Sequence, residues 1–260
     1  MKQNKNAVIT FVFNNYDWLR EPITIDDGFD YYCLTDDKNL ESKVWKCIYI
    51  PSLDSYSLTD RQKVNIAKAD FLKYIPDGYE WWICMDASVK IVGNLSELIS
   101  YFEKNSYDIG ISIEQNTKTF KEAYYLFEKY GRIDHDCVET FKKYVDSENI
   151  DWEEYTGMIE GTMKVYKNTK YVLDMLNEMH DIYKKACDFK DLNDQCYLTI
   201  AFSKYDDKFN TCFFYNQLYN ASKYFERYKH NSDYRLFSST NERSNNNFFL
   251  GKYRKLKTFL

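Results

Sequence analysis

Short apolar runs that end abruptly in polar residues restrict the fold of this sequence more than any other feature. Two of them are residues 7–13 (AVITFVF) and residues 80–85 (EWWICM). Unbroken apolar runs of this length are typical of strands buried on both faces of a parallel sheet. Strand-like and helix-like segments alternate along the chain, which predicts an α/β fold with a mainly parallel central sheet flanked by helices.

The other elements are predicted from the same two periodicities, of about two residues for strands and 3.6 for helices. Further strands are expected at residues 29–34, 44–50, 89–92, 108–113, 158–166 and 211–215. Helices are expected at residues 60–75, 95–102 (capped by Asn94), 119–130 and 134–145, then after a capping Asn168, and from near Asn193.

The chain of 260 residues shows no internal repeat and no linker rich in Pro, Gly or Ser. We therefore expect one domain over residues 1–230, with a helical insert at about 115–152 and a polar tail at 231–260. We expect the insert and the tail to determine which acceptor the protein uses.

Charge and cysteine content exclude several classes of protein. The net charge of −5 argues against a nucleic-acid binder, which would need a dense basic surface. No apolar run approaches the roughly 20 residues that span a bilayer, so we expect no transmembrane segment and a cytoplasmic location. The seven cysteines form no C-x-x-C pair, which predicts buried, reduced thiols.

Polar side chains follow several of the predicted strands. In open α/β sheets, ligands bind outside the carboxyl ends of the strands. The residues at these positions are Asn14, Asn15, Asp36, Asp37, Asp86, Ser88 and Glu114. The first strand is not followed by a Gly-rich loop, which argues against a dinucleotide site or a P-loop. A divalent cation could hold a diphosphate instead, and Asp86 is placed to bind one.

Four short motifs occur in a recognisable order. They are residues 32–37 (YCLTDD), residues 61–68 (RQKVNIAK), Asp86-Ala87-Ser88 and Asn193-Asp194-Gln195. Over residues 8–202 this order resembles the glycosyltransferase A fold, a single Rossmann-like domain in which an Asp-x-Asp motif holds a metal and a nucleotide sugar. The sequence is most similar to an Asp-Ala-Ser group related to plant Golgi mucilage glycosyltransferases. In this sequence the second aspartate of the motif is replaced by Ser88, which is a neutral and therefore weaker metal ligand.

The resemblance implies a role for each matching residue. Asp194 would bind hydroxyls of the donor sugar, Gln195 would lie near the anomeric carbon, and Glu160 would contact the acceptor or act as a base. Mn²⁺ or Mg²⁺ would be held by Asp86, Ser88 and His230. The donor would contact Thr35, Asp36, Asp37, Arg61, Asn65, Lys68, Asp86, Ala87 and Ser88.

Ordinary structural roles remain open for these residues. The aspartates at strand ends could form turns, and Asp194 could be an acid in the first turn of a helix. Arg61 and Lys68 could lie on a solvated helix face, and His230 could belong to a loop.

The predicted function is metal-assisted, retaining transfer of a sugar from a nucleotide diphosphate sugar, such as a UDP-sugar, to a glycan or other acceptor in polysaccharide biosynthesis. The alternative is a non-catalytic module of the same fold that binds sugar or nucleotide, as the replacement at Ser88 suggests. A nucleotidyltransferase ranks lower, because residues 14–17 (NNYD) do not supply the Gly-rich, basic loop that such enzymes use.

Overall fold

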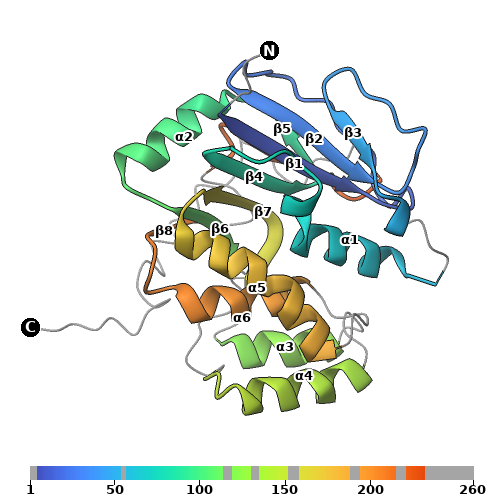
Figure 1. Cartoon of the computed structure of the whole chain (residues 1–260), viewed down its shortest axis with the longest axis vertical. Coiled ribbons are helices and arrows are strands. Elements are labelled where there is room, and N and C mark those ends of the chain that lie inside the picture. Colours follow the sequence, from blue (N-terminus) through green and yellow to red (C-terminus); the bar gives the residue numbers. More distant parts are fainter. Residues whose placement is uncertain are drawn as a thin grey trace, which may run out of the picture.

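The computed structural model describes residues 5–53, 57–113, 119–129, 135–151, 158–187, 194–214 and 221–231. Its main feature is a seven-stranded sheet in the order β3-β2-β1-β4-β7-β6-β8 (Figure 1). The strands are β1 (Asn6–Val12), β2 (Phe29–Thr35), β3 (Lys46–Tyr49), β4 (Trp81–Asp86), β6 (Ile109–Ile113), β7 (Ile159–Lys167) and β8 (Thr211–Phe214). In this sheet β7 runs antiparallel to both neighbours and the other pairs are parallel, which confirms the predicted α/β class.

Helices cover both faces of the sheet. One face carries α1 (Asp60–Ala69), α3 (Phe120–Lys129), α4 (His135–Ser147), α5 (Lys170–Cys187) and α6 (Asp194–Tyr205) (Figure 1). The other carries α2 (Leu95–Lys104) and a ribbon of β5 (Val89–Ile91) and β9 (Phe225–Arg227). In β4, Trp82 and Cys84 pack into the core on the face that carries α1, α5 and α6, while Ile83 and Met85 pack into the core on the opposite face, beneath α2. This alternation explains why the strand reads as an unbroken apolar run.

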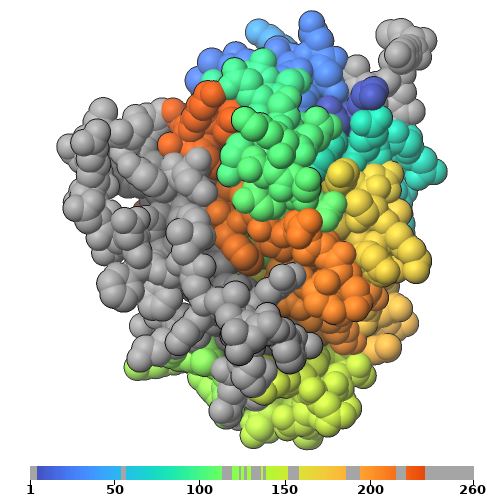
Figure 2. Space-filling model, turned by 90° about the vertical axis from the view of Figure 1, so that its left-hand side faces the viewer, coloured from blue at the N-terminus to red at the C-terminus, as the bar shows by residue number. Residues whose placement is uncertain are grey.

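The β5–β9 ribbon lies against α2 on the face that Figure 2 presents, where the segment around β9 and the helix are side by side. Lys223, just before β9, forms an ion pair with Glu97 of α2. The sequence does not predict β9 as a partner of β5, because strand pairing across more than 130 residues leaves no local pattern.

Two predicted helix boundaries are wrong. The helix expected to reach residue 75 ends at Ala69, because Asp70 leaves helical geometry (φ −112°, ψ 13°) and a 3-10 turn, η2 (Phe71–Lys73), follows. The Asp70 carboxylate Oδ2 lies 2.9 Å from Nδ1 of His180 in α5. Helix α5 is capped by Thr169, whose Oγ1 accepts the Val172 N–H, and not by Asn168.

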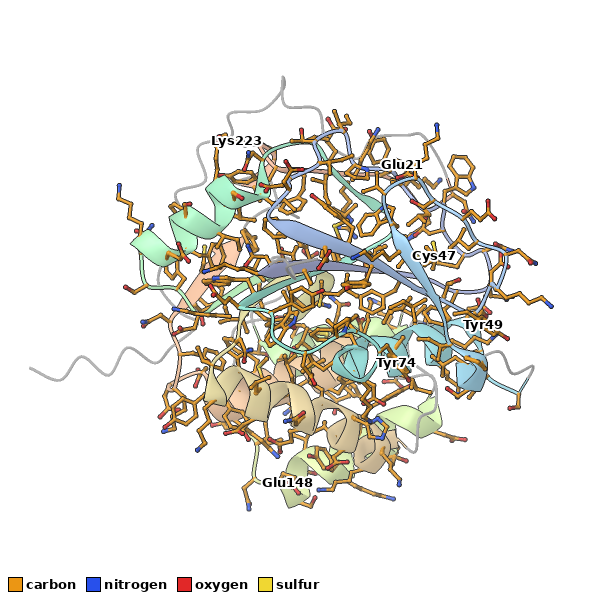
Figure 3. All side chains as sticks on the ribbon, turned by 45° about the horizontal axis from the view of Figure 1, so that its top comes forward. Glu21, Cys47, Tyr49, Tyr74, Glu148 and Lys223 are labelled. Carbon is orange, nitrogen blue, oxygen red and sulfur yellow. The ribbon has the colours of Figure 1, made fainter. Side chains whose placement is uncertain are left out.

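Other expectations hold with small shifts. Asn94 caps α2 through a bond from the Glu97 N–H (3.2 Å). The strand expected at residues 44–50 is shorter, and β3 with its labelled Cys47 and Tyr49 lies at the edge of the sheet (Figure 3). The described cysteines are free thiols, as predicted: Cys33, Cys84, Cys196 and Cys212 are buried and Cys47 is half-buried.

Some predictions lie outside the described residues, namely Glu114, parts of the insert at 115–152, and the tail beyond Asn231. In the described part of the chain, no helix is both long enough and apolar enough to cross a membrane.

Candidate active site

The carboxyl ends of three adjacent strands bring the predicted polar residues to one edge of the sheet. Phe11 of β1 is level with Asp86 of β4, and Val12 is level with Thr35 of β2. The chain segments that leave β1, β2 and β4 therefore begin side by side, and ligand sites of open α/β sheets occur at such an edge.

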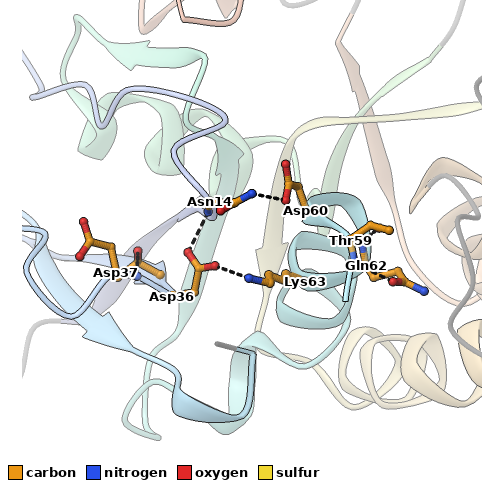
Figure 4. Close-up of polar contacts among 8 residues, drawn as sticks. Asn14, Asp36, Asp37, Thr59, Asp60, Gln62 and Lys63 are labelled. Carbon is orange, nitrogen blue, oxygen red and sulfur yellow. Dashed lines mark hydrogen bonds and ion pairs between the residues drawn. The ribbon is translucent and has the colours of Figure 1, made fainter. Parts of the chain in front are cut away.

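One group of side chains at this edge, the Asp36 cluster, consists of Asn14, Asp36, Asp60 and Lys63 (Figure 4). Asp36 Oδ1 accepts the Asn14 backbone N–H (2.8 Å), and its Oδ2 pairs with Lys63 Nζ (2.7 Å). The Asn14 amide donates to Asp60 Oδ1 at 2.5 Å. The side chains of Lys63 and Asp36 are only 8% and 7% exposed, so α1 is locked onto the end of β2 by a buried ion pair.

The turn after β1 explains how Asn14 reaches Asp36. Asn14 and Asn15 have φ of 50° and 55°, in the left-handed region that asparagine tolerates better than most residues. The sequence reasoning missed Lys63, Asp60 and the role of Asn14. The pair Asn14-Asn15 directly after a buried strand is the signal that could have indicated this turn.

Asp37 and Thr35 make local bonds. The Asp37 N–H donates to Thr35 Oγ1 (3.0 Å), and Asp37 Oδ1 accepts the Asn39 N–H (2.8 Å). This arrangement is typical of an aspartate that shapes a turn. Of the two aspartates that follow β2, Asp36 is the one that joins other elements.

A second group, the Lys68 cluster, consists of Lys68, Asp86, Asp194 and Lys164. Lys68 Nζ lies 2.7 Å from Asp86 Oδ1 and 2.8 Å from Asp194 Oδ2. Lys68 comes from α1, Asp86 from the end of β4, and Asp194 is the first residue of α6. Three residues predicted separately from the sequence are thus in direct contact.

Gly161 makes room for this contact. A Cβ built on Gly161 would lie 2.2 Å from Asp194 Oδ2, so the carboxylate rests directly on the glycine backbone. A glycine within a strand often marks a group that lies against the backbone, and here that group is the Asp194 carboxylate. Any other residue here would push Asp194 away from Lys68.

Lys164 is a residue of the cluster that the sequence reasoning missed. It is 3% exposed on β7, opposite Cys84 of β4, and its Nζ donates to the Gly161 carbonyl at 2.7 Å. A lone lysine in the otherwise apolar end of residues 158–166 (MIEGTMKVY) is the signal that could have found it, because a lysine is rarely buried without acidic partners.

The charges of the cluster set its ionisation. Burial would lower the pKa of Lys68, but the Asp194 and Asp86 carboxylates outweigh it and raise that pKa. Burial would raise the pKa of Asp194, but Lys68 and Lys164 lower it. The pKa of Lys164 is lowered by burial and by repulsion from Lys68, against the pull of both carboxylates. Lys68 is therefore cationic and Asp194 anionic at neutral pH.

Gln195 and Glu160 flank the cluster. The Gln195 backbone N–H helps to lower the pKa of Asp194, as expected at a helix N-terminus. The Gln195 carbonyl accepts the Thr199 hydroxyl (2.6 Å), and Thr199 Oγ1 in turn accepts the Ile159 N–H (3.0 Å). These bonds join helix α6 to β7 beside Glu160. Glu160 is only 5% exposed.

The remaining predicted donor contacts differ in exposure. Arg61 is exposed on α1, whereas Asn65 is buried and its carbonyl accepts the Tyr197 hydroxyl (3.1 Å). Ala87 is buried in the core beneath α2. The bond from Tyr197 joins α1 to α6, the two helices that supply Lys68 and Asp194, so Asn65 helps to hold these helices together.

The predicted metal ligands lie near one another. The β5–β9 ribbon carries Ser88 and His230 toward the end of β4, since the Tyr228 N–H donates to the Ser88 carbonyl (2.8 Å). His230 Nδ1 lies 2.5 Å from Asp17 Oδ2. This hydrogen bond raises the pKa of His230, against burial, and the charges of Asp17 and Asp86 add to the increase.

These residues fit a divalent cation that shares its coordination with a bound ligand. The described residues contain no group of three or more His, Cys, Asp or Glu side chains placed to hold a metal. Asp86 and His230 would supply two such side chains, and Ser88 would add a neutral oxygen. Ser88 Oγ is buried and has no hydrogen-bond partner among the described residues. Mg²⁺ is commonly held by one or two carboxylates together with phosphate oxygens, which suits such an incomplete set.

Similarity to known proteins is found among solved structures. A scan against models of protein families finds no match, and a search of curated protein sequences finds none either. Among solved structures, the chain is similar to mouse xyloside xylosyltransferase 1, with 10% identity and a TM-score of 0.41, over 80% of this chain and 84% of that one. It is similar to the galactosyltransferase LgtC at 12% identity, TM-score 0.42, over 80% and 73%. It is similar to the Saccharomyces cerevisiae mannosyltransferase Ktr4p at 10% identity, TM-score 0.43, over 95% and 76%.

Because these TM-scores are below 0.5, the similarities support no conclusion about this chain, and its chemistry has to be inferred from its own residues.

Proposed function

We propose that this chain is a glycosyltransferase that moves a sugar from a nucleotide diphosphate sugar, such as a UDP-sugar, to a glycan or other acceptor with retention of configuration. The order of motifs at residues 32–37, 61–68, 86–88 and 193–195 supports this assignment. The observation that carries it is the contact of Lys68 with both Asp86 and Asp194, at 2.7 and 2.8 Å.

This contact gathers the groups that glycosyl transfer from a diphosphate requires. Asp194 is held ionised, so it can accept hydrogen bonds from hydroxyls of a donor sugar. The Lys68 ammonium lies at the strand ends, where a departing diphosphate would gain negative charge. Both groups are held by buried neighbours, so little reorganisation is needed when a ligand binds.

Other residues would complete the donor site. Asp36, held by Lys63, would lie near the nucleoside, and Gln195 near the anomeric carbon, with Glu160 toward the acceptor. Asp86, Ser88 and His230 would hold Mn²⁺ or Mg²⁺. A bound divalent cation would neutralise charge on the leaving diphosphate.

The test is calorimetric binding of UDP and of UDP- and GDP-sugars, with and without Mn²⁺, followed by product analysis for slow donor hydrolysis. Binding of one donor with hydrolysis supports the proposal, and absence of binding to every nucleotide would refute it. Asp86→Asn should abolish hydrolysis and leave the folded state intact. Asp207→Asn is the matched control, because Asp207 is exposed and pairs with its sequence neighbour Lys208 at 2.8 Å.

A second candidate, a binding module without catalysis, is favoured by Ser88, which replaces an anionic ligand by a neutral one. Donor binding without any hydrolysis or transfer, unchanged by Mn²⁺, would support this candidate.

A further inference from the structure

Lys164 is a buried cation within the cluster, and neither the motifs nor the resemblance gives it a role. We propose that Lys164 is a positioning residue that fixes an irregular stretch of β7 at Gly161 and so holds Asp194 in place beside Lys68. Its connection to sugar transfer rests on the proposed function, whereas its action on Asp194 does not.

The first step concerns the shape of β7. Along β6 the register passes from Ile111, opposite Lys164, to Ser112, opposite Glu160. One step on β6 therefore corresponds to four on β7, and residues 161–163 have no partner on β6, although Met163 still pairs with Met85 of β4. The bond from Lys164 Nζ to the Gly161 carbonyl, 2.7 Å long, spans this irregularity. Bulges of this kind redirect side chains next to active sites.

The second step concerns Asp194. Its carboxylate rests on the Gly161 backbone, where a Cβ would come within 2.2 Å of Oδ2. The position of Gly161 thus decides how close Asp194 comes to Lys68, which is 2.8 Å away. A change in the bulge would be transmitted directly to the Lys68 contact.

The third step concerns charge. The Lys68 cluster contains two ammonium groups and two carboxylates. Lys164 adds to the larger effect of Lys68 and lowers the pKa of Asp194. Lys164 therefore keeps Asp194 anionic as well as in place. A neutral apolar residue would fill the same space in the core with no such effect.

Two substitutions separate the hydrogen bond from the charge. Lys164→Gln keeps a donor for the Gly161 carbonyl and removes the charge, whereas Lys164→Met removes both. The exposed end of the same strand offers a matched control, Lys167→Met, since the Lys167 side chain is 39% exposed.

The first experiment measures the free energy of unfolding by urea denaturation from acidic to neutral pH, through the range below the unfolded pKa of Asp194, for the wild type, K164Q, D194N and the double variant K164Q/D194N. Asp194 has a lowered pKa in the folded state, so its stabilising contribution is present above the unfolded pKa of roughly 3.9 and is lost as the pH falls. In K164Q the folded-state pKa of Asp194 should be lowered less, so this contribution should be smaller and its loss should be complete at a higher pH. The two substitutions should deviate from additivity by about tenfold in the unfolding equilibrium constant. Equal effects of K164Q in the Asp194 and D194N backgrounds would overturn the proposal.

The second experiment measures donor hydrolysis, or transfer once an acceptor is known. K164Q should lower kcat roughly tenfold or more with a smaller change in KM, and should shift the acidic limb of the pH profile upward. K164M should lower kcat further, and K167M should not change it. An active wild type with unchanged kcat in K164Q would refute the role in transfer. A wild type that binds no nucleotide sugar would refute the proposed function alone, because the unfolding cycle still decides whether Lys164 acts on Asp194.

Discussion

Gly161→Ala tests whether the space between β7 and α6 is reserved for the Asp194 carboxylate. The new Cβ would lie 2.2 Å from Oδ2, about 1 Å inside the range where ordinary van der Waals contact begins, near 3.4 Å. The φ of Gly161 is not in the left-handed region, so an alanine backbone is allowed there. The whole penalty should therefore come from the contact with Asp194.

The expected loss in the free energy of unfolding follows from the movement that the new methyl group would force on the Asp194 carboxylate. Asp194 can retreat only by lengthening its 2.8 Å bond to Lys68. Weakening a hydrogen bond to a charged group costs about 1.5–3 kcal/mol. Overpacking a core costs about 1–3 kcal/mol, and replacing glycine in a strand returns roughly 0.5–1 kcal/mol. We expect a net loss of about 3.5 kcal/mol, which corresponds to a Tm lower by roughly 7–14 °C in a domain of this size.

Urea denaturation of G161A and of the double variant G161A/D194A measures this directly. With the carboxylate removed, the alanine should cost less than about 0.5 kcal/mol, because nothing is left to displace. Gly28→Ala is the control, since its Cβ would lie 3.2 Å from Asp26 Oδ1 and the neighbour needs to move little. An equal penalty for G161A with and without the Asp194 carboxylate would refute the reasoning.

Three further predictions concern other parts of the structure. Lys63→Met should lower the free energy of unfolding by about 3 kcal/mol in urea denaturation, because Asp36 would stay buried without its partner, and adding Asp36→Asn should restore part of it. A variant as stable as the wild type would contradict the buried ion pair. Iodoacetamide should alkylate Cys47 first among the five described cysteines, as peptide mass spectrometry can show, because a hydrogen bond from Cys33 lowers the pKa of Cys47 against burial. Asp26→Asn should lower stability at neutral pH. Burial raises the pKa of Asp26, but bonds from two backbone N–H groups and a serine hydroxyl lower it overall. The difference from wild type in a thermal melt should therefore shrink as the pH falls toward 3, and a constant difference would argue against it.

Local patterns in the sequence were enough to predict the succession of strands and helices and the strand ends at which polar residues appear. Burial on both faces leaves an unbroken apolar run, as in β4, and such a run can be read locally, together with Asp86 at its end. Gly161 was likewise recognisable as a place of close approach, because a glycine within a strand-like segment often marks a bulge or a group that lies against the backbone.

Long-range packing determined which of these groups meet. Asp86 and Asp194 are 108 residues apart, and only the insertion of β7 between β4 and β6 puts Gly161 under the Asp194 carboxylate. The lone lysine in the apolar end of residues 158–166 is a local signal for Lys164, but the sequence does not show whether this side chain points to solvent or into the core. Its burial depends on α6 and β4 together, and pairings over such distances depend on loop closure and side-chain packing that no local periodicity records.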